Sequence, residues 1–233
     1  MFSQWQLTPE EASALWLSTK VGLWCTIIIA VPGILTGWLL ARTQFAGKSL
    51  VDGLVHLPLV LPPVVPGYLL LLLLGKQGVL GKWLYQVWGI SLVFNWKGAV
   101  MASAVMAFPL MVRAVRLAVG LVEVRLEDAA RTLGAGPLRV FLTITLPLSL
   151  PGIMTGLVLA FARSLGEFGA TITFVGNVAG ATRTLPLAIF TYTQIPGADG
   201  QALRLVVLSL LLALGALLVS EVIAKRVVRL LGR

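Results

Sequence analysis

Long stretches without a charged residue are the feature that most constrains this chain. Residues 21–41 contain none, and residues 205–220 form a second such stretch. About 20 consecutive apolar residues are enough for an α-helix to cross the hydrocarbon core of a bilayer. The mean hydropathy is +0.96 and charged residues make up only 12 % of the chain, against about 25 % in an ordinary soluble domain. These values exclude a soluble globular protein, a disordered chain and a fibrous repeat, and they predict an integral membrane protein.

We expect one all-α membrane domain over residues 1–233, built as a helical bundle. A sixth crossing would have to lie in residues 78–95, where Trp83, Tyr85 and Trp88 instead favour a helix that lies in the headgroup region. The hydropathy pattern therefore predicts five transmembrane helices, or six if that segment crosses, and the five lie at about 15–41, 54–74, 97–117, 150–175 and 203–224.

The distribution of Lys and Arg predicts the orientation in the membrane. With five spans, eleven basic residues lie on one side and six on the other. Because basic residues gather at cytoplasmic span ends, we expect a periplasmic N-terminus, with the 113–147 segment and the C-terminus in the cytoplasm. The formal charge of +9 is therefore interpreted as membrane topology and not as nucleic-acid binding.

Cysteine and histidine occur once each, as Cys25 and His56. This excludes a disulfide within the chain, and it disfavours thiolate and imidazole metal sites. A membrane-embedded enzyme would need a catalytic set inside the spans, but Glu167 is the sole acid well inside one. We expect no catalytic residue, no metal and no cofactor on this chain.

Two groups of residues inside the spans are candidates for a translocation path or gate. Pro62, Pro63 and Pro66 lie within the second span, which cannot be one straight helix because each proline removes a backbone donor. The segment is either a kinked packing helix or a flexible wall of the path. Arg163 and Glu167 share a helix face at i,i+4 and must avoid lipid. They form either a gate or anion path, or a buried structural ion pair.

Two GxxxG patterns, Gly33–Gly37 and Gly152–Gly156, allow close approach of helix backbones. They suit contact between subunits or packing within the chain, and we favour packing within the chain.

The longest charged stretch is residues 113–139, and we expect the cytoplasmic loop 118–147 to form a helix–turn–helix protrusion. Glu127 and Arg131 are expected to pair at i,i+4. Gly134 can take the left-handed conformation that ends a helix, and Pro137 can start a second one. Apolar residues recur at helical spacing along the first helix: Val122, Leu126, Ala129 and Leu133.

The same stretch resembles a known motif, the loop of bacterial ABC importer permeases, in its sequence DAARTLGAGPLRVFLTITLP. In that family the loop is the coupling helix, which sits in a cleft of a cytoplasmic ATPase. Asp128 replaces the glutamate of the family, and Glu127 is an alternative acid for the partner contact. The adjacent alanines leave one helix face nearly free of side chains for a partner. The matching positions are Asp128, Ala129, Ala130, Gly134, Ile144, Leu146 and Pro147.

The resemblance extends over about residues 15–224 and is to the permease subunits of molybdate importers. The segments that carry it include HLPLVLPPVVPGYLLL and LAFARSLGEFGATITFVGN. It implies the type I ABC importer permease fold in the bacterial inner membrane, two paired copies, two ATPase subunits and a periplasmic oxyanion-binding protein. Permeases for sulfate/thiosulfate and tungstate share much of this pattern and remain alternatives.

The chain is not expected to bind the nucleotide itself. Gly47-Lys48-Ser49 mimics the end of a phosphate-binding loop, but Arg42 replaces the earlier glycine that such a loop requires. We therefore expect ATP and magnesium on the partner ATPase. Its closure would move the protrusion as a lever, so that the two bundles alternate their access. A passive channel or a purely structural membrane subunit would not explain the protrusion.

Overall fold

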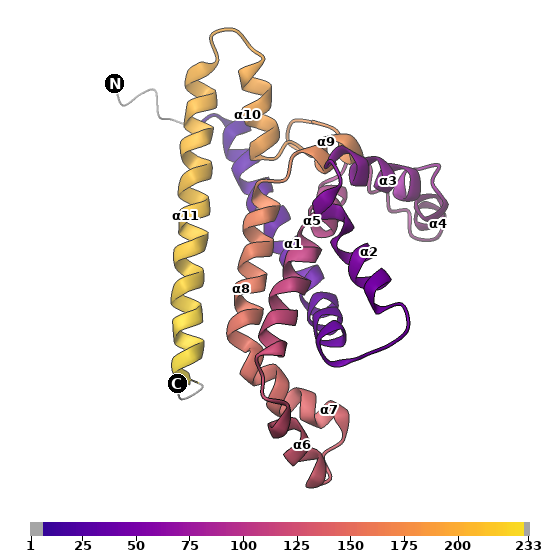
Figure 1. Cartoon of the computed structure of the whole chain (residues 1–233). Helices are drawn as coiled ribbons and strands as arrows, with labels where there is room; N and C mark the ends of the chain where they lie inside the picture. Colours follow the sequence, from indigo (N-terminus) through magenta and orange to yellow (C-terminus); the bar gives the residue numbers. More distant parts are fainter. Residues whose placement is uncertain (1–6, 231–233) are drawn as a thin grey trace.

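The structure is a computed structural model that describes residues 7–230. All regular elements in this range are helical (Figure 1). They are α1 (Pro9–Arg42), α2 (Lys48–Val60), α3 (Val64–Leu74), α4 (Val79–Trp88), α5 (Trp96–Gly120), α6 (Val124–Thr132), α7 (Pro137–Val140), a π-helical turn (Phe141–Thr145), α8 (Leu146–Leu165), α9 (Gly169–Val175), α10 (Leu185–Thr193) and α11 (Asp199–Leu230).

Local sequence explains where the longest helices begin. At the start of α1 the Glu11 amide donates to Thr8 Oγ1, and the Thr8 amide donates to the Glu11 carboxylate at 2.8 Å. This reciprocal capping box satisfies two amides that the first turn leaves free. The side chain of Asn95 similarly accepts from the Lys97 amide at the start of α5.

In the part of the chain that the structure describes, four helices are long and apolar enough to cross a membrane: Pro9–Arg42, Trp96–Gly120, the continuous run Pro137–Leu165, and Asp199–Val219. The pair α2 and α3, which is bent by 112° at its break, adds a fifth if it is one broken span. The break falls at residues 61–63, so the prediction that this proline-rich segment is not one straight helix is confirmed.

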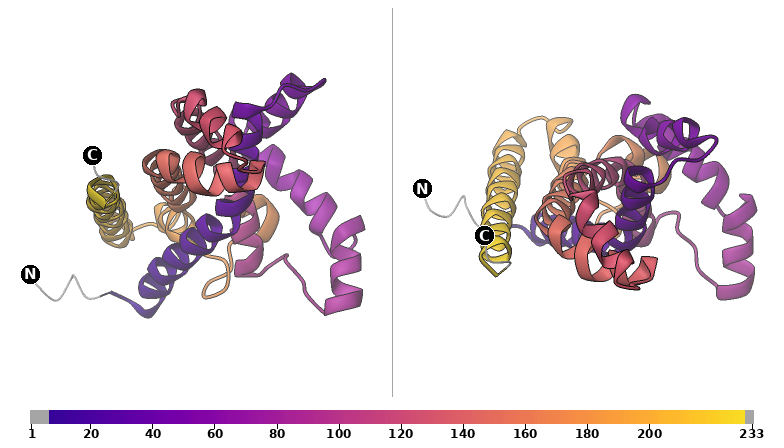
Figure 2. Two further views of the ribbon diagram at one scale, coloured as in Figure 1. Left: turned by 90° about the horizontal axis from the view of Figure 1, so that it is seen from below. Right: turned by 60° about the horizontal axis from the view of Figure 1, so that its bottom comes forward.

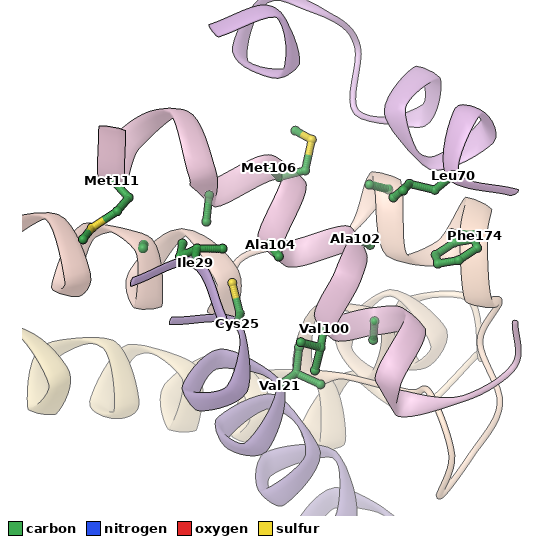
Figure 3. Close-up of a cluster of buried hydrophobic side chains, with 14 of the residues drawn as sticks. Val21, Cys25, Ile29, Leu70, Val100, Ala102, Ala104, Met106, Met111 and Phe174 are labelled. Carbon is green, nitrogen blue, oxygen red and sulfur yellow. The ribbon is translucent and has the colours of Figure 1, made fainter. Parts of the chain in front are cut away.

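The centre of the fold is the contact of α1, α5 and α8. A Cβ added at Gly37 would lie 2.7 Å from Cβ of Val115 in α5, and one added at Gly156 would lie 2.9 Å from Met111 Sδ. Both GxxxG patterns therefore serve packing within the chain, as expected. Figure 3 shows the buried cluster here, in which Cys25 of α1 lies against α5.

The stretch 150–175, expected to be one span, is instead divided between two helices. Helix α8 ends at Leu165 and α9 starts at Gly169. The reason is that the Glu167 carboxylate accepts from the amide of Ala170 at 2.8 Å and so caps a new helix. Helix α10 was not predicted either, because its nine residues are too few to stand out as a transmembrane segment in the hydropathy pattern.

Helix α4 lies in the 78–95 segment, and its ten residues are too few to cross a bilayer as a helix. It lies apart from the bundle (Figure 2) and, of its residues, only Gly81 is buried. Trp83, Tyr85 and Trp88 are all exposed. At the level of the whole molecule, α6 and α7 lie at the same end as the C-terminal end of α11, and the start of α1 lies at the opposite end (Figure 1).

Candidate functional site

The helix–turn–helix protrusion is formed by α6 and α7 at one end of the bundle, as predicted. Gly134 adopts φ +84°, the left-handed conformation that ends α6. Gly136 then adopts an extended conformation and Pro137 is the first residue of α7. A proline there loses no hydrogen bond because first-turn amides have no partner in their own helix. Helix α7 continues through the π-helical turn into α8.

The protrusion exposes most of its apolar stripe. Val122 is buried against the bundle, but Leu126 and Ala129 are exposed and the Leu133 side chain is 89 % exposed. On α7, Leu138 is also exposed. Apolar side chains gathered on a small protrusion indicate a surface that a partner protein covers.

The prediction that Glu127 pairs with Arg131 is wrong. Glu127 is only 3 % exposed, and its Oε1 accepts from Arg42 Nε at 3.1 Å and from Thr145 Oγ1 at 2.7 Å. Arg131 pairs instead with Asp128 at 3.0 Å, and both of these side chains are more than half exposed. The two adjacent acids are thus separated: Glu127 faces the bundle, and Asp128 faces outward where a partner can reach it.

Arg42 ties the protrusion to the membrane helices. It is the last residue of α1, and its Nη2 also donates to the backbone oxygen of Val122 at 2.7 Å. Thr145 lies in the π-helical turn that leads into α8. Glu127 therefore connects α6 to both α1 and the start of α8.

The residues assigned to coupling fall into two structural groups. Asp128, Ala129, Ala130 and Gly134 belong to α6 and its turn, and all but the half-buried Ala130 are exposed. The other group is at the junction with α8, where Leu146 packs against the main core. Its members are Ile144, Leu146 and Pro147, and all three are half-buried.

The structure brings the two candidate gate regions together, although they are a hundred residues apart. A Cβ added at Gly169 would lie 2.6 Å from Cβ of Pro63. The break between α2 and α3 therefore packs directly on the break between α8 and α9. In this region Pro66 is buried, while Pro62 and Pro63 are exposed.

Arg163 and Glu167 form the ion pair that their spacing allows, with Arg163 Nη1 2.8 Å from Glu167 Oε2. The Glu167 side chain is 1 % exposed and that of Arg163 is 26 % exposed. Glu167 also caps α9, so the pair has a structural role at the helix break. The Arg163 side chain stays partly accessible, as contact with an anion in a path would require.

The polar network at the other end of the molecule was not predicted from the sequence. The Glu11 carboxylate is fully buried and lies 2.9 Å from Arg204 Nη2, which joins α1 to α11. Arg183 donates to Asn177 at 3.0 Å and lies 3.4 Å from Glu10. A charge inside the first turn of a long apolar helix is the signal that could have pointed to this network, since a buried acid needs a partner.

A known protein family and several of its members match most of this chain. Residues 33–229 match the family described as "Binding-protein-dependent transport system inner membrane component". The chain is 56 % identical over 224 residues to the "Molybdenum transport system permease protein ModB" of Haemophilus influenzae, covering 96 % of this chain and 97 % of that protein. For the protein of the same name in Escherichia coli (strain K12), the identity is 58 % over 219 residues, covering 94 % and 96 %. The "Sulfate transport system permease protein CysW" of Synechocystis sp. is 36 % identical over 217 residues, covering 92 % and 77 %.

Solved structures share the architecture at low sequence identity. A chain of the inward-facing MetNI methionine ABC transporter superposes with a TM-score of 0.69 at 18 % identity, and 96 % of each chain is covered. A chain of a bacterial ABC transporter that imports alginate gives a TM-score of 0.75 at 17 % identity, covering 94 % of this chain and 80 % of that one. The fold is therefore that of the type I ABC importer permeases.

Proposed function

This chain belongs to the family of binding-protein-dependent transport system inner membrane components, and from that membership we propose that it is the membrane-spanning permease subunit of an ATP-driven importer of molybdate. The observation that carries the proposal is an identity of 56–58 % to permeases named for molybdenum transport, over nearly the full length of both proteins. The relative named for sulfate transport is much more distant, at 36 %.

ATP is hydrolysed on a separate subunit, and this chain transmits the work. The exposed apolar stripe of α6, with Asp128 beside it, is the surface that enters a cleft of the ATPase. The buried contact of Glu127 with Arg42 then carries the movement of α6 into α1, and Thr145 carries it into α8. Because both links are short and buried, the protrusion and these helices move as one body. No cofactor binds to this chain in this scheme, and ATP with magnesium stays on the partner.

The full transporter contains two copies of this chain, two ATPase subunits and a periplasmic protein that delivers the oxyanion. A solved importer of the same fold is described in complex with its ligand-bound periplasmic protein, which supports the last of these partners. The protrusion lies in the cytoplasm together with the C-terminal end of α11, and α1 starts on the periplasmic side. The excess of Lys and Arg on the protrusion side supports this orientation.

The path for the anion passes the contact between the two helix breaks. Pro62, Pro63 and Pro66 prevent a continuous helix on one side, and Glu167 starts a new helix on the other. Broken helices have low resistance to bending and commonly form substrate paths in transporters. Arg163, whose side chain is partly accessible beside Glu167, supplies a positive charge to this path.

The test is uptake of labelled molybdate in cells that lack only this chain, with and without a plasmid that restores it. We expect molybdate uptake at low external concentration to be lost and then restored, while sulfate uptake is unchanged. Unchanged molybdate uptake in the deletion strain would refute the assignment. Loss of tungstate or sulfate uptake alone would replace molybdate with that anion.

A nucleotide-binding subunit should also co-purify with this chain from the membrane. Its absence from the purified complex would favour a channel or a structural subunit.

A further inference from the structure

A basic groove lies between α2 and α5 at the α6 end of the bundle. It measures about 830 Å³, and its charged lining consists of Lys48, Asp52, Arg113 and Arg116, with His56 beside them. Three cationic side chains face one carboxylate, which leaves a net charge of +2 when the histidine is counted as neutral. A groove with low-dielectric walls and one sign of charge concentrates ions of the opposite sign.

The three cations differ in the ion pairs and hydrogen bonds that they already make. Arg116 Nη1 donates to both carboxylate oxygens of Asp52 at 2.8 Å, so this pair is internally neutralised. Lys48 Nζ donates to the backbone oxygen of Thr43 at 2.9 Å, which keeps its charge at the groove. Arg113 is exposed, and among the side chains that the structure describes none forms a hydrogen bond or an ion pair with it.

An unpaired arginine on a membrane helix needs an explanation. Arg113 lies about two turns before the end of α5 at Gly120, where the predicted span approaches the α6 end of the bundle. A cation within a span is costly unless it faces a cavity, an interface or a counter-ion. Lipid-facing basic residues can reach the headgroups, but Arg113 also lines a second groove of about 780 Å³ between α5 and α8. It therefore stands where two grooves meet, together with Leu117 and Leu121.

We propose that the groove between α2 and α5 binds a tetrahedral oxyanion, with Arg113 as the principal ligand and Lys48 as the second cation. This inference rests on the proposed function, since it makes the groove the place where the transported dianion pauses before release at the α6 end. A guanidinium can donate two parallel hydrogen bonds to an oxyanion. Asp52 keeps Arg116 from adding a third cation, so the anion is held weakly enough to leave.

The position of α2 fits such a site, because this helix can move without disturbing the core. None of its residues is buried, and its principal polar link to α5 is the Asp52–Arg116 pair. A shift of α2 would separate that pair and change the charge offered to the anion. The groove thus couples the geometry of the broken span to the strength of anion binding.

The test measures the groove directly and does not depend on transport. Leu117, which is 64 % exposed and lines both grooves, is replaced by cysteine in the full complex with its ATPase. The native Cys25 is buried and does not compete. The rate of modification by an anionic methanethiosulfonate is then measured in phosphatidylcholine nanodiscs, with sodium molybdate or sodium chloride at equal ionic strength. Ala46→Cys is the matched control, since Ala46 is exposed at the same end of the molecule and does not line the groove.

We expect millimolar molybdate to slow modification of the Leu117→Cys protein by about threefold or more, and not that of the Ala46→Cys protein. Adding Arg113→Gln should remove this protection, while Arg113→Lys should keep part of it. Size-exclusion profiles of the complexes confirm that each variant is assembled.

Changing the lipid composition of the nanodiscs identifies the source of the oxyanion. Protection by molybdate in phosphatidylcholine supports the transported anion. Protection only after phosphatidylglycerol is added, and lost with Arg113→Gln, identifies the phosphate of a lipid as the ligand. If neither molybdate nor phosphatidylglycerol protects the cysteine, or if protection survives Arg113→Gln, the proposed site is wrong. Failure of the uptake test with intact molybdate protection would reject the proposed function and leave this site standing.

Discussion

Replacement of Arg42 by methionine should release α6 from the membrane helices. The change removes the cation that contacts Glu127 at 3.0 Å and the hydrogen bond to Val122. Glu127, which is 3 % exposed, would keep only the hydroxyl of Thr145. Breaking a buried ion pair from one side costs about 3–5 kcal/mol, because the remaining charge stays buried without its partner. Arg42 is itself 15 % exposed, so we expect the lower end, about 3 kcal/mol.

Amide hydrogen exchange of α6 in the nanodisc-bound transporter measures this cost as the free energy of local opening. A loss of about 3 kcal/mol should raise exchange across residues 124–132 by roughly 100-fold, since 1.4 kcal/mol corresponds to a factor of ten. Amides of α5 serve as the internal reference. The ATP consumed per molybdate transported should rise in the same variant, because α6 then moves without moving α1.

Two further variants test the reasoning. The double change Arg42→Met with Glu127→Leu removes both charges, so exchange should return to within about 1 kcal/mol of wild type. Arg131→Gln breaks an ion pair whose side chains are both more than half exposed, and it should change the opening free energy by less than about 0.5 kcal/mol. An increase below tenfold for Arg42→Met, or an equal effect of Arg131→Gln, would refute the buried tether.

Three other predictions concern single positions. Gly134→Val should cost about 1–2 kcal/mol of local stability and uncouple ATP hydrolysis from uptake, because valine is strained at φ +84°; Gly136→Val, at φ −68° with open space around it, should transport normally. Gly169→Ala should lower the thermal unfolding temperature and the uptake rate, since the added Cβ would collide with Pro63. Gly166→Ala is the control, because its Cβ meets only one atom, at 4.0 Å. An equal effect of the two changes would contradict the close contact. Leu133→Ser should leave the thermal stability of the permease unchanged and weaken ATPase association at least about tenfold, as measured by co-purification, because the proposed function places this exposed apolar side chain in contact with the ATPase.

Features set by neighbouring residues were predictable from the sequence. The end of α6 at Gly134 and the start of α7 at Pro137 depend only on the backbone preferences of those residues. The bend between α2 and α3 follows in the same way from its prolines. The GxxxG patterns indicated close helix packing, although they did not say which helix would lie against them.

Pairing between distant residues was not predictable. The i,i+4 rule assigned Arg131 to Glu127, but the actual partner, Arg42, is 85 residues away and meets Glu127 only because the end of α1 lies beside the first turn of α6. The cap that Glu167 places on α9 was missed for a related reason. An acid between two glycines, such as Glu167 between Gly166 and Gly169, can continue a helix face or start a new helix, and the packing of Gly169 on Pro63 favours the second.

The sequence by itself determined that this chain is a membrane protein, that it is helical, and that a short amphipathic protrusion lies between two of its spans. Hydropathy, helical periodicity and turn preferences are properties of contiguous residues, so no tertiary information is needed to read them. Only the tertiary structure decided which acid of the protrusion turns inward, which helix breaks meet, and that the basic residues of α2 and α5 share a groove. Those outcomes depend on the burial and pairing of charges, which are established when helices far apart in the chain pack together.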